Sequence, residues 1–255
     1  TYISAIDYID RAMEWGSKYN VSVLLDLATV PGGQGDSNEP QTTSRYIADW
    51  HSSTNGRHVA LEVLERLASR YAVADALYGI ELLDSPVMSV RKNMFTMTDG
   101  IPGHYLRNFY RDAYDLLRKH MTNDKAVVFS ASGYPGLWKH FMRSSQYKNV
   151  MMDVHLYHYH DENAQDITSP RGLSAAIARN KAQIREAVGT GFPVIIGEWS
   201  AAAVMSSASV TPEGRSAYER VFVANQLASF SQAEGWFFQT WKTEKLGCAP
   251  CAGNP

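Results

Sequence analysis

The sequence predicts an α/β fold in which parallel strands alternate with helices, and three observations support it. Short apolar runs alternate with helical patterns along the chain. The runs are almost continuously apolar, as are strands that helices cover on both faces. Polar residues stand at the carboxyl ends of nearly all runs, as at Asp26, Asp84 and Glu198. An open sheet gathers its site at one switch point, whereas a barrel collects residues from many strand ends, so this pattern favours a barrel.

Length and composition narrow the class of protein. The chain has 255 residues and a mass of 28.4 kDa, close to the size of one α/β barrel. Lys and Arg number 24 and Asp and Glu number 26, and the net charge of −2 argues against a general nucleic-acid binder. Apolar residues make up 45% of the chain, which excludes a disordered protein. No apolar run is long enough to predict a membrane-spanning helix.

Apolar residues at helical spacing predict six helices. In the first, Ile6, Ile9 and Met13 share one face, and in the second Ala60 and Leu64 belong to an i, i+3, i+4, i+7 pattern. The later helices show the same periodicity. The predicted helices cover about 3–19, 55–72, 103–120, 136–146, 172–190 and 213–234.

Six apolar runs between these helices predict buried strands. They cover 21–27, 77–83, 126–129, 149–155, 193–197 and 235–241. Long irregular stretches follow four of the strands, near 28–54, 84–102, 156–171 and 199–212. Because a barrel builds its substrate cleft from the loops on that side, the cleft is expected there.

Two other motifs receive structural interpretations. Residues 31–35 are glycine-rich but lack the Gly-Lys-Ser/Thr ending of a phosphate loop, which favours a turn-rich cleft loop over a nucleotide site. Cys248 and Cys251 lie in a Pro/Gly-containing tail over 246–255, and this context favours a structural disulfide, or pairing with another chain segment, over redox chemistry. Asn20 opens a glycosylation sequon.

Three histidines, His155, His158 and His160, lie close together at the end of a predicted strand. Successive strand residues point to opposite faces, so His158 and His160 project together while His155 points elsewhere. A metal site is one interpretation of this spacing. The simpler one is a strand that runs into a polar loop, and no metal or cofactor is predicted.

The most informative single feature is Glu198, within Gly-Glu-Trp-Ser at 197–200. A carboxylate at the end of an apolar strand is costly to place unless it is hydrogen-bonded or functional. A structural glutamate at a strand end is the alternative interpretation. Three further segments, at 79–86, 153–157 and 236–244, include the ends of other predicted strands and the polar residues there.

Together with residues 26–32, these segments resemble glycoside hydrolase family 5, and within it the fungal-type exo-β-1,3-glucanases. The resemblance runs in order from about Tyr2 to Glu244. It implies a (β/α)8 barrel over 1–245, of which this chain supplies about the last six units, and a retaining mechanism. It also implies that an upstream segment or a partner chain closes the barrel and that an orienting arginine lies upstream.

The resemblance assigns roles to particular side chains. Glu198 matches the nucleophile, and His155 and Tyr157 match the pair that flank the sugar to be cleaved. Trp241 matches an aromatic platform, where an indole packs on the C–H face of a sugar. Asp84 replaces an asparagine that hydrogen-bonds the sugar 2-hydroxyl.

Two positions depart from the family pattern. Ser85 stands where the family carries its acid/base glutamate, and Ala28 stands where it carries a histidine. A retaining glycosidase needs two carboxyl groups about 5–5.5 Å apart, and a serine hydroxyl is a poor general acid. Glu81 points to the same face as Ser85, but it lies four residues earlier, about 13 Å deeper along the strand, and cannot reach the same bond. Strand alternation points Asp84 away from the site, although a twist of the loop at the strand end would bring it back.

Three functions follow from this pattern. The first is a glucan-recognising relative of the exo-β-1,3-glucanases that has lost most or all of its catalysis. The second is an active retaining glycosidase with a displaced acid such as Asp84. The third is an extracellular scaffold with a disused cleft. The family, the sequon and the paired cysteines together predict secretion, with β-glucan or a related oligosaccharide as the expected ligand.

Overall fold

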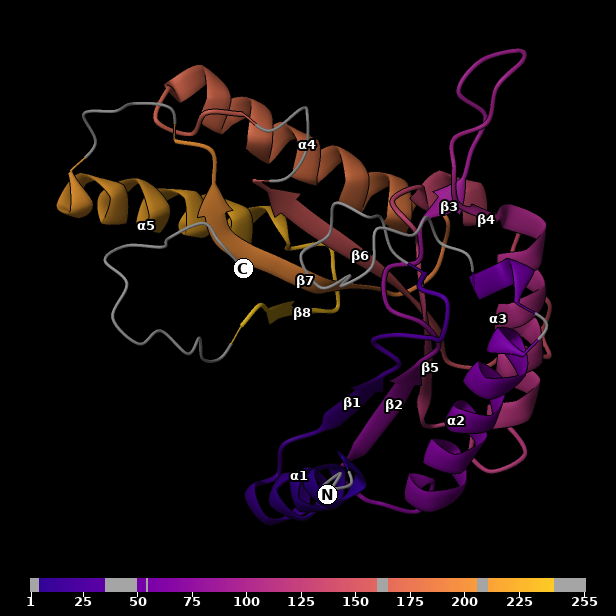
Figure 1. The fold of residues 1–255 in the computed structure, drawn as a ribbon. Helices are drawn as coiled ribbons and strands as arrows, with labels where there is room; N and C mark the ends of the chain where they lie inside the picture. The colour runs from indigo at the N-terminus through magenta and orange to yellow at the C-terminus, as the bar shows by residue number, and fades with distance from the viewer. Residues whose placement is uncertain (1–4, 35–49, 54, 160–164, 206–210, 241–255) are drawn as a thin grey trace. The chain divides into compact units, whose positions relative to one another are not determined.

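The computed structural model describes residues 5–34, 50–53, 55–159, 165–205 and 211–240. The chain forms two compact units. The first comprises 1–133 and 140–151, and the second comprises 134–139 and 152–255. In both units, parallel strands alternate with helices along the chain (Figure 1).

The first unit contains three parallel strands, with β2 in the middle between β1 and β5. Its elements are α1 (Ala5–Tyr19), β1 (Val23–Asp26), η1 (Trp50–Ser52), α2 (Gly56–Tyr71), β2 (Leu77–Glu81), β3 (Met88–Ser89), β4 (Ile101–Pro102), α3 (Gly103–Leu117) and β5 (Ala126–Ser130). The short strands β3 and β4 form a separate parallel pair that the sequence did not predict.

The core of the first unit lies between its strands and the helices α2 and α3. All five residues of β5 are buried, as expected for a strand covered on both faces. Trp50 is fully buried and meets the rings of Tyr105 and Phe109 edge-on, with centroids 5.3 and 4.7 Å apart. Gly79 is required for strand pairing, because a Cβ there would lie 2.3 Å from the backbone oxygen of Ala126.

The second unit also contains three parallel strands, with β7 between β6 and β8. Its elements are η2 (Pro135–Trp138), β6 (Val150–His158), α4 (Pro170–Val188), β7 (Val194–Ala203), α5 (Pro212–Ser229) and β8 (Gly235–Phe238), and the first two residues of β6 belong to the first unit. Helices α4 and α5 pack against each other and against β7.

Side-chain caps set where α4 and α5 begin. Ser169 and Thr211 have extended backbones, and their hydroxyls accept hydrogen bonds from the backbone N–H of Gly172 and Gly214. These bonds satisfy donors that have no partner within the helix. A proline follows each cap at the first helical position, where its missing N–H costs nothing.

Apart from the unpredicted pair β3 and β4, the predicted order of strands and helices is confirmed with one exception. The helix predicted over 136–146 is wrong, because only the four-residue 3-10 helix η2 forms there. Met142 adopts a left-handed φ of +45°, and left-handed residues end a right-handed helix. Within the described ranges, no helix is both long and apolar enough to cross a membrane.

Candidate active site

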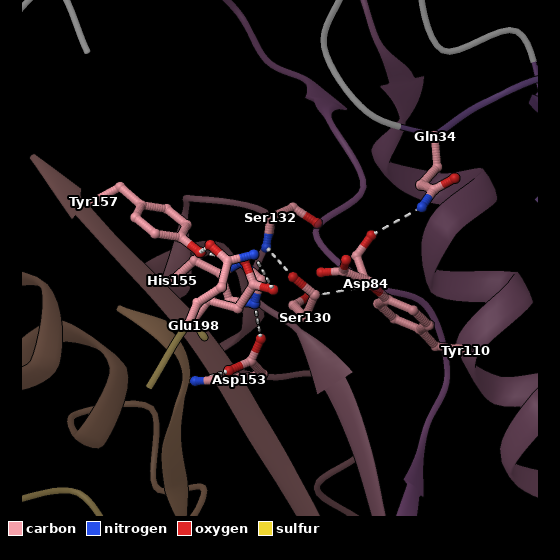
Figure 2. A network of polar contacts seen from close by, with 11 residues as sticks. Gln34, Asp84, Tyr110, Ser130, Ser132, Asp153, His155, Tyr157 and Glu198 are labelled. Atoms are coloured by element: carbon pink, nitrogen blue, oxygen red, sulfur yellow. Dashed lines mark hydrogen bonds and ion pairs between the residues drawn. The ribbon is translucent and has the colours of Figure 1, made fainter. Parts of the chain in front are cut away.

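The ends of β6 and β7 bring four polar side chains together in the second unit (Figure 2). Asp153, His155 and Tyr157 alternate along β6 and therefore share one face of that strand. Glu198, on β7, lies opposite His155 in the strand register. His155, Tyr157 and Glu198 thus lie close together, and the roles that the resemblance gives them stay a prediction.

A β-bulge in β7 produces this alignment. Asp153 pairs with Ile195, but His155, two residues further along β6, pairs with Glu198, three residues further along β7. The extra residue changes which side chains of β7 share the face of His155. In an unbroken register Gly197 would stand opposite His155, and Glu198 would point to the other face.

The Glu198 carboxylate is held at both oxygens. The Tyr157 hydroxyl donates to Oε2 at 2.5 Å, and Nε2 of Gln239 donates to Oε1 at 3.3 Å. The Nδ1 atom of His155 lies 3.6 Å from Oε2. The Tyr157 hydroxyl also contacts Oε1 of Gln239. The Glu198 side chain keeps 27% of its surface exposed, so an oriented carboxylate remains open to a ligand.

Asp153 connects the two strands from a fully buried position. Its Oδ1 accepts a hydrogen bond of 2.5 Å from the backbone N–H of Gly197, and its Oδ2 lies 2.7 Å from Nε2 of His155. The contact between Oδ2 and Nε2 is an ion pair when the imidazole is protonated. The chain thus places one carboxylate against each ring nitrogen of His155.

His158 belongs to the opposite face of β6, as strand alternation predicts. It is 1% exposed, and its Nε2 lies 2.8 Å from Oδ1 of Asn180 on α4. Arg179 contacts its Nδ1 at 3.1 Å, and the ring of Phe222 meets it edge-on. His158 therefore packs against helices, and His160 lies outside the described residues. Among those residues, no group of three or more His, Cys, Asp or Glu side chains is arranged to hold a metal.

Trp199 follows Glu198 but takes part in packing. It is 2% exposed and meets three aromatic rings at centroid distances of 5.0–5.4 Å, those of Phe230, Trp236 and Phe238. The predicted platform residue Trp241 lies outside the described residues, as do Cys248 and Cys251.

Asp84 and Ser85 lie in the first unit, after the end of strand β2. Strand β2 ends at Glu81, and residues 82–85 form bends. Ser85 has a left-handed φ of +36°. Strand alternation therefore does not determine where the Asp84 side chain points. Gln34 ties this bend to the preceding loop, because its Nε2 donates to the backbone oxygens of Ala28 at 2.8 Å and Asp84 at 3.3 Å.

Two residues of the candidate site escaped the sequence argument. Asp153 carries a usable signal, since it stands two residues before His155 on a strand and so shares its face. Gln239 carries a weaker one, since it follows the last strand and is separated from Tyr157 by 82 positions. Its contacts depend on the pairing of β7 with β8.

Comparison of the sequence with known proteins finds consistent relatives. The chain is 28% identical over 273 residues to a glucan 1,3-β-glucosidase of Schwanniomyces occidentalis, covering 94% of this chain and 60% of that protein. It is 27% identical to the glucan 1,3-β-glucosidase of Blumeria graminis, with the same coverage. The chain is thus similar in sequence to glucan 1,3-β-glucosidases. It spans about 60% of the length of these relatives, and no family model matches it.

Solved structures identify the fold of the chain. Endo-glycoceramidase II from Rhodococcus sp., in its lactosyl-enzyme intermediate, aligns with a TM-score of 0.60 at 16% identity over 91% of this chain and 58% of that one. Thermotoga maritima Cel5A, in complex with cellobiose, aligns with a TM-score of 0.62 at 13% identity over 94% of this chain and 72% of that one. These likenesses confirm the predicted α/β-barrel fold, of which the chain supplies a part.

Proposed function

We propose that the protein binds β-glucan at a site that includes Glu198, and that its hydrolysis of natural glucans is impaired. The proposal is supported by the relation to glucan 1,3-β-glucosidases and by the contacts of Glu198 within the second unit. The observation that carries it is the partly exposed Glu198 carboxylate, which Tyr157 and Gln239 hold at both oxygens.

The second unit supplies a candidate nucleophile for the first half of a retaining reaction. An oriented carboxylate can attack the anomeric carbon and form a glycosyl ester while the bond to the leaving oxygen breaks. Glu198 takes this role in the proposal. His155 and Tyr157 flank the sugar, Asp84 contacts its hydroxyl groups and Trp241 supplies an apolar platform, all by resemblance to the family.

Protonation of the leaving oxygen is the step that the proposal makes deficient. Ser85 occupies the position of the acid in the family pattern, and general acid catalysis contributes about 10²–10⁴-fold. A sugar alkoxide leaves poorly without a proton, whereas a dinitrophenolate or fluoride leaves without one. The protein should therefore form an adduct from activated glucosides far faster than it cleaves glucans.

Three measurements on the full-length protein test this proposal. Calorimetry with laminari-oligosaccharides should detect binding, and maltooligosaccharides of equal length serve as the control. A 2-deoxy-2-fluoro-glucosyl fluoride should leave a covalent adduct on Glu198, detected by mass spectrometry and absent in Glu198→Gln. The double variant Ser85→Glu with Asp84→Asn should gain hydrolysis of laminari-oligosaccharides. If no glucan binding is detected, the proposal fails and the third function, an extracellular scaffold with a disused cleft, is favoured.

The second candidate is an active retaining glycosidase in which Asp84 is the displaced acid. Strand β2 ends at Glu81, so Asp84 lies outside the strand. The alternation of side chains along a strand therefore does not turn Asp84 away from the site, which favours this second candidate. In this case the wild type hydrolyses laminari-oligosaccharides, and Asp84→Asn abolishes that activity while retaining activity on dinitrophenyl glucoside. Azide should then rescue Asp84→Asn and yield a β-glucosyl azide.

The proposal also covers where the protein is located and what closes its barrel. Its relatives are glucan 1,3-β-glucosidases of fungi, which favours secretion or a cell-wall location for this protein also. Detection of the protein in the culture medium or in a wall fraction tests this part. Closure of the barrel by further chain remains a prediction.

A further inference from the structure

We propose that Asp153 is a positioning residue that orients His155 and keeps its ring charged toward Glu198. This inference deepens the proposed function and rests on it, because it concerns the same carboxylate. The resemblance to the family assigns Asp153 no role, whereas its burial and its two contacts do.

Both oxygens of Asp153 are directed at residues that adjoin Glu198. Oδ1 accepts the N–H of Gly197, the residue before Glu198, and Oδ2 faces His155, the residue opposite Glu198 in the register. A Cβ at position 197 would lie 2.1 Å from Oδ1, so only glycine admits this approach. The bulge, the glycine and the buried carboxylate therefore form one arrangement.

The charge of Asp153 requires a partner in this position. The side chain is fully buried, and an unpaired buried carboxylate is strongly unfavourable. Within the second unit, Asp153 and Tyr157 from β6 and Glu198 from β7 face His155. Arg179, from α4, contacts the backbone oxygen of Tyr157 and the ring of His158. A protonated His155 is the cation that both neighbouring carboxylates favour.

The consequence for Glu198 follows from the two ring nitrogens. With Nε2 at 2.7 Å from Oδ2 of Asp153, Nδ1 lies 3.6 Å from Oε2 of Glu198. A protonated Nδ1 attracts the Glu198 carboxylate, whereas a neutral ring with its proton on Nε2 presents a lone pair to it. Asp153 thus acts on the nucleophile through His155 without touching the substrate.

The test compares Asp153→Asn with Asn180→Asp in the full-length protein. The asparagine keeps the volume of Asp153 and an acceptor for the Gly197 N–H but removes the charge. The control makes the reverse exchange next to His158, on the opposite face of the same strand. Imidazole nitrogen and proton resonances are followed by NMR against pH, with His155 assigned from the spectrum of His155→Gln.

In the wild type, His155 should carry protons on both nitrogens at about pH 7. In Asp153→Asn its titration midpoint should fall by about one pH unit or more, while Asn180→Asp should shift His158 and leave His155 unchanged. Formation of the Glu198 adduct should slow about tenfold in Asp153→Asn, with glucan affinity unchanged.

Two outcomes would overturn the inference. One is a wild-type His155 that is neutral at pH 6–7, a measurement that needs no variant to fold. The other is an Asp153→Asn protein whose His155 titrates as in the wild type. Because the NMR readout requires no glucan, it decides the role of Asp153 even if the protein binds none and the proposed function fails.

Discussion

Gly197 shows how one small residue can determine the contacts that surround its neighbour. Its missing side chain leaves room for Asp153, and its N–H satisfies one oxygen of that buried carboxylate. Glu198 comes next in the chain and takes its direction from the same bulge. The candidate site therefore depends on a backbone feature as much as on its charged groups.

We predict that Gly197→Ala destabilises the protein and disturbs the site together. The added Cβ would lie 2.1 Å from Oδ1 and 2.5 Å from Cγ of Asp153, so the carboxylate or the strand must move. Overpacking of this kind costs about 1–3 kcal/mol. Denaturant unfolding measures the loss, and the control is Gly235→Ala, where a Cβ meets nothing within 4 Å. Equal stability of the two variants would contradict the prediction.

Helices α1 and α2 are joined by a polar contact at their exposed side. Nε and Nη2 of Arg70 donate to the Asp10 carboxylate at 2.8 and 2.5 Å, and the Tyr71 hydroxyl donates to it at 2.8 Å. The hydrogen bond from Arg70, with a smaller contribution from Tyr71, lowers the pKa of Asp10 from 3.8 to about 2. Burial is the main cause that raises the pKa of Tyr71.

This lowered pKa predicts a pH-dependent contribution of Asp10 to stability. A carboxylate whose pKa is lower in the folded state stabilises that state above its unfolded pKa of 3.8. The contribution is lost as the pH falls from about 4 to about 2. Asp10→Asn should therefore be less stable than the wild type at pH 6, and the difference should shrink below pH 4 and vanish only below about pH 2. Exposed Glu14→Gln, on the same helix, is the control, and a difference independent of pH would refute the assignment.

For the whole molecule, binding of glucan should appear as added stability. A ligand at 100 times its dissociation constant that binds only the folded protein stabilises it by about 2.7 kcal/mol. For a chain of this size, that corresponds to about 5–10 °C in the unfolding midpoint. Calorimetric unfolding with laminari-oligosaccharides should show the increase, and maltooligosaccharides should not. An equal increase with both sugars would exclude β-glucan specificity.

The order of elements could be predicted because its signals are local. Apolar runs and the 3.6-residue period lie within single segments, so strands and helices follow from sequence without knowledge of their partners. The association of His155 with Tyr157 follows from alternation along one strand. The failed helix at 136–146 shows the limit, because an apolar pattern does not reveal the left-handed backbone of Met142.

Sequence by itself predicted the α/β-barrel class and the likeness to glucan 1,3-β-glucosidases, and it singled out Glu198, His155 and Tyr157 as candidate site residues whose roles stay a prediction. Only the tertiary structure decided how Glu198 is held. Gly197 contacts Asp153 across 44 positions, and Gln239 reaches Tyr157 across 82. Such contacts depend on strand register, and a one-residue bulge reverses the face on which every later side chain lies. That bulge arises from pairing between strands, so no pattern within either strand predicts it.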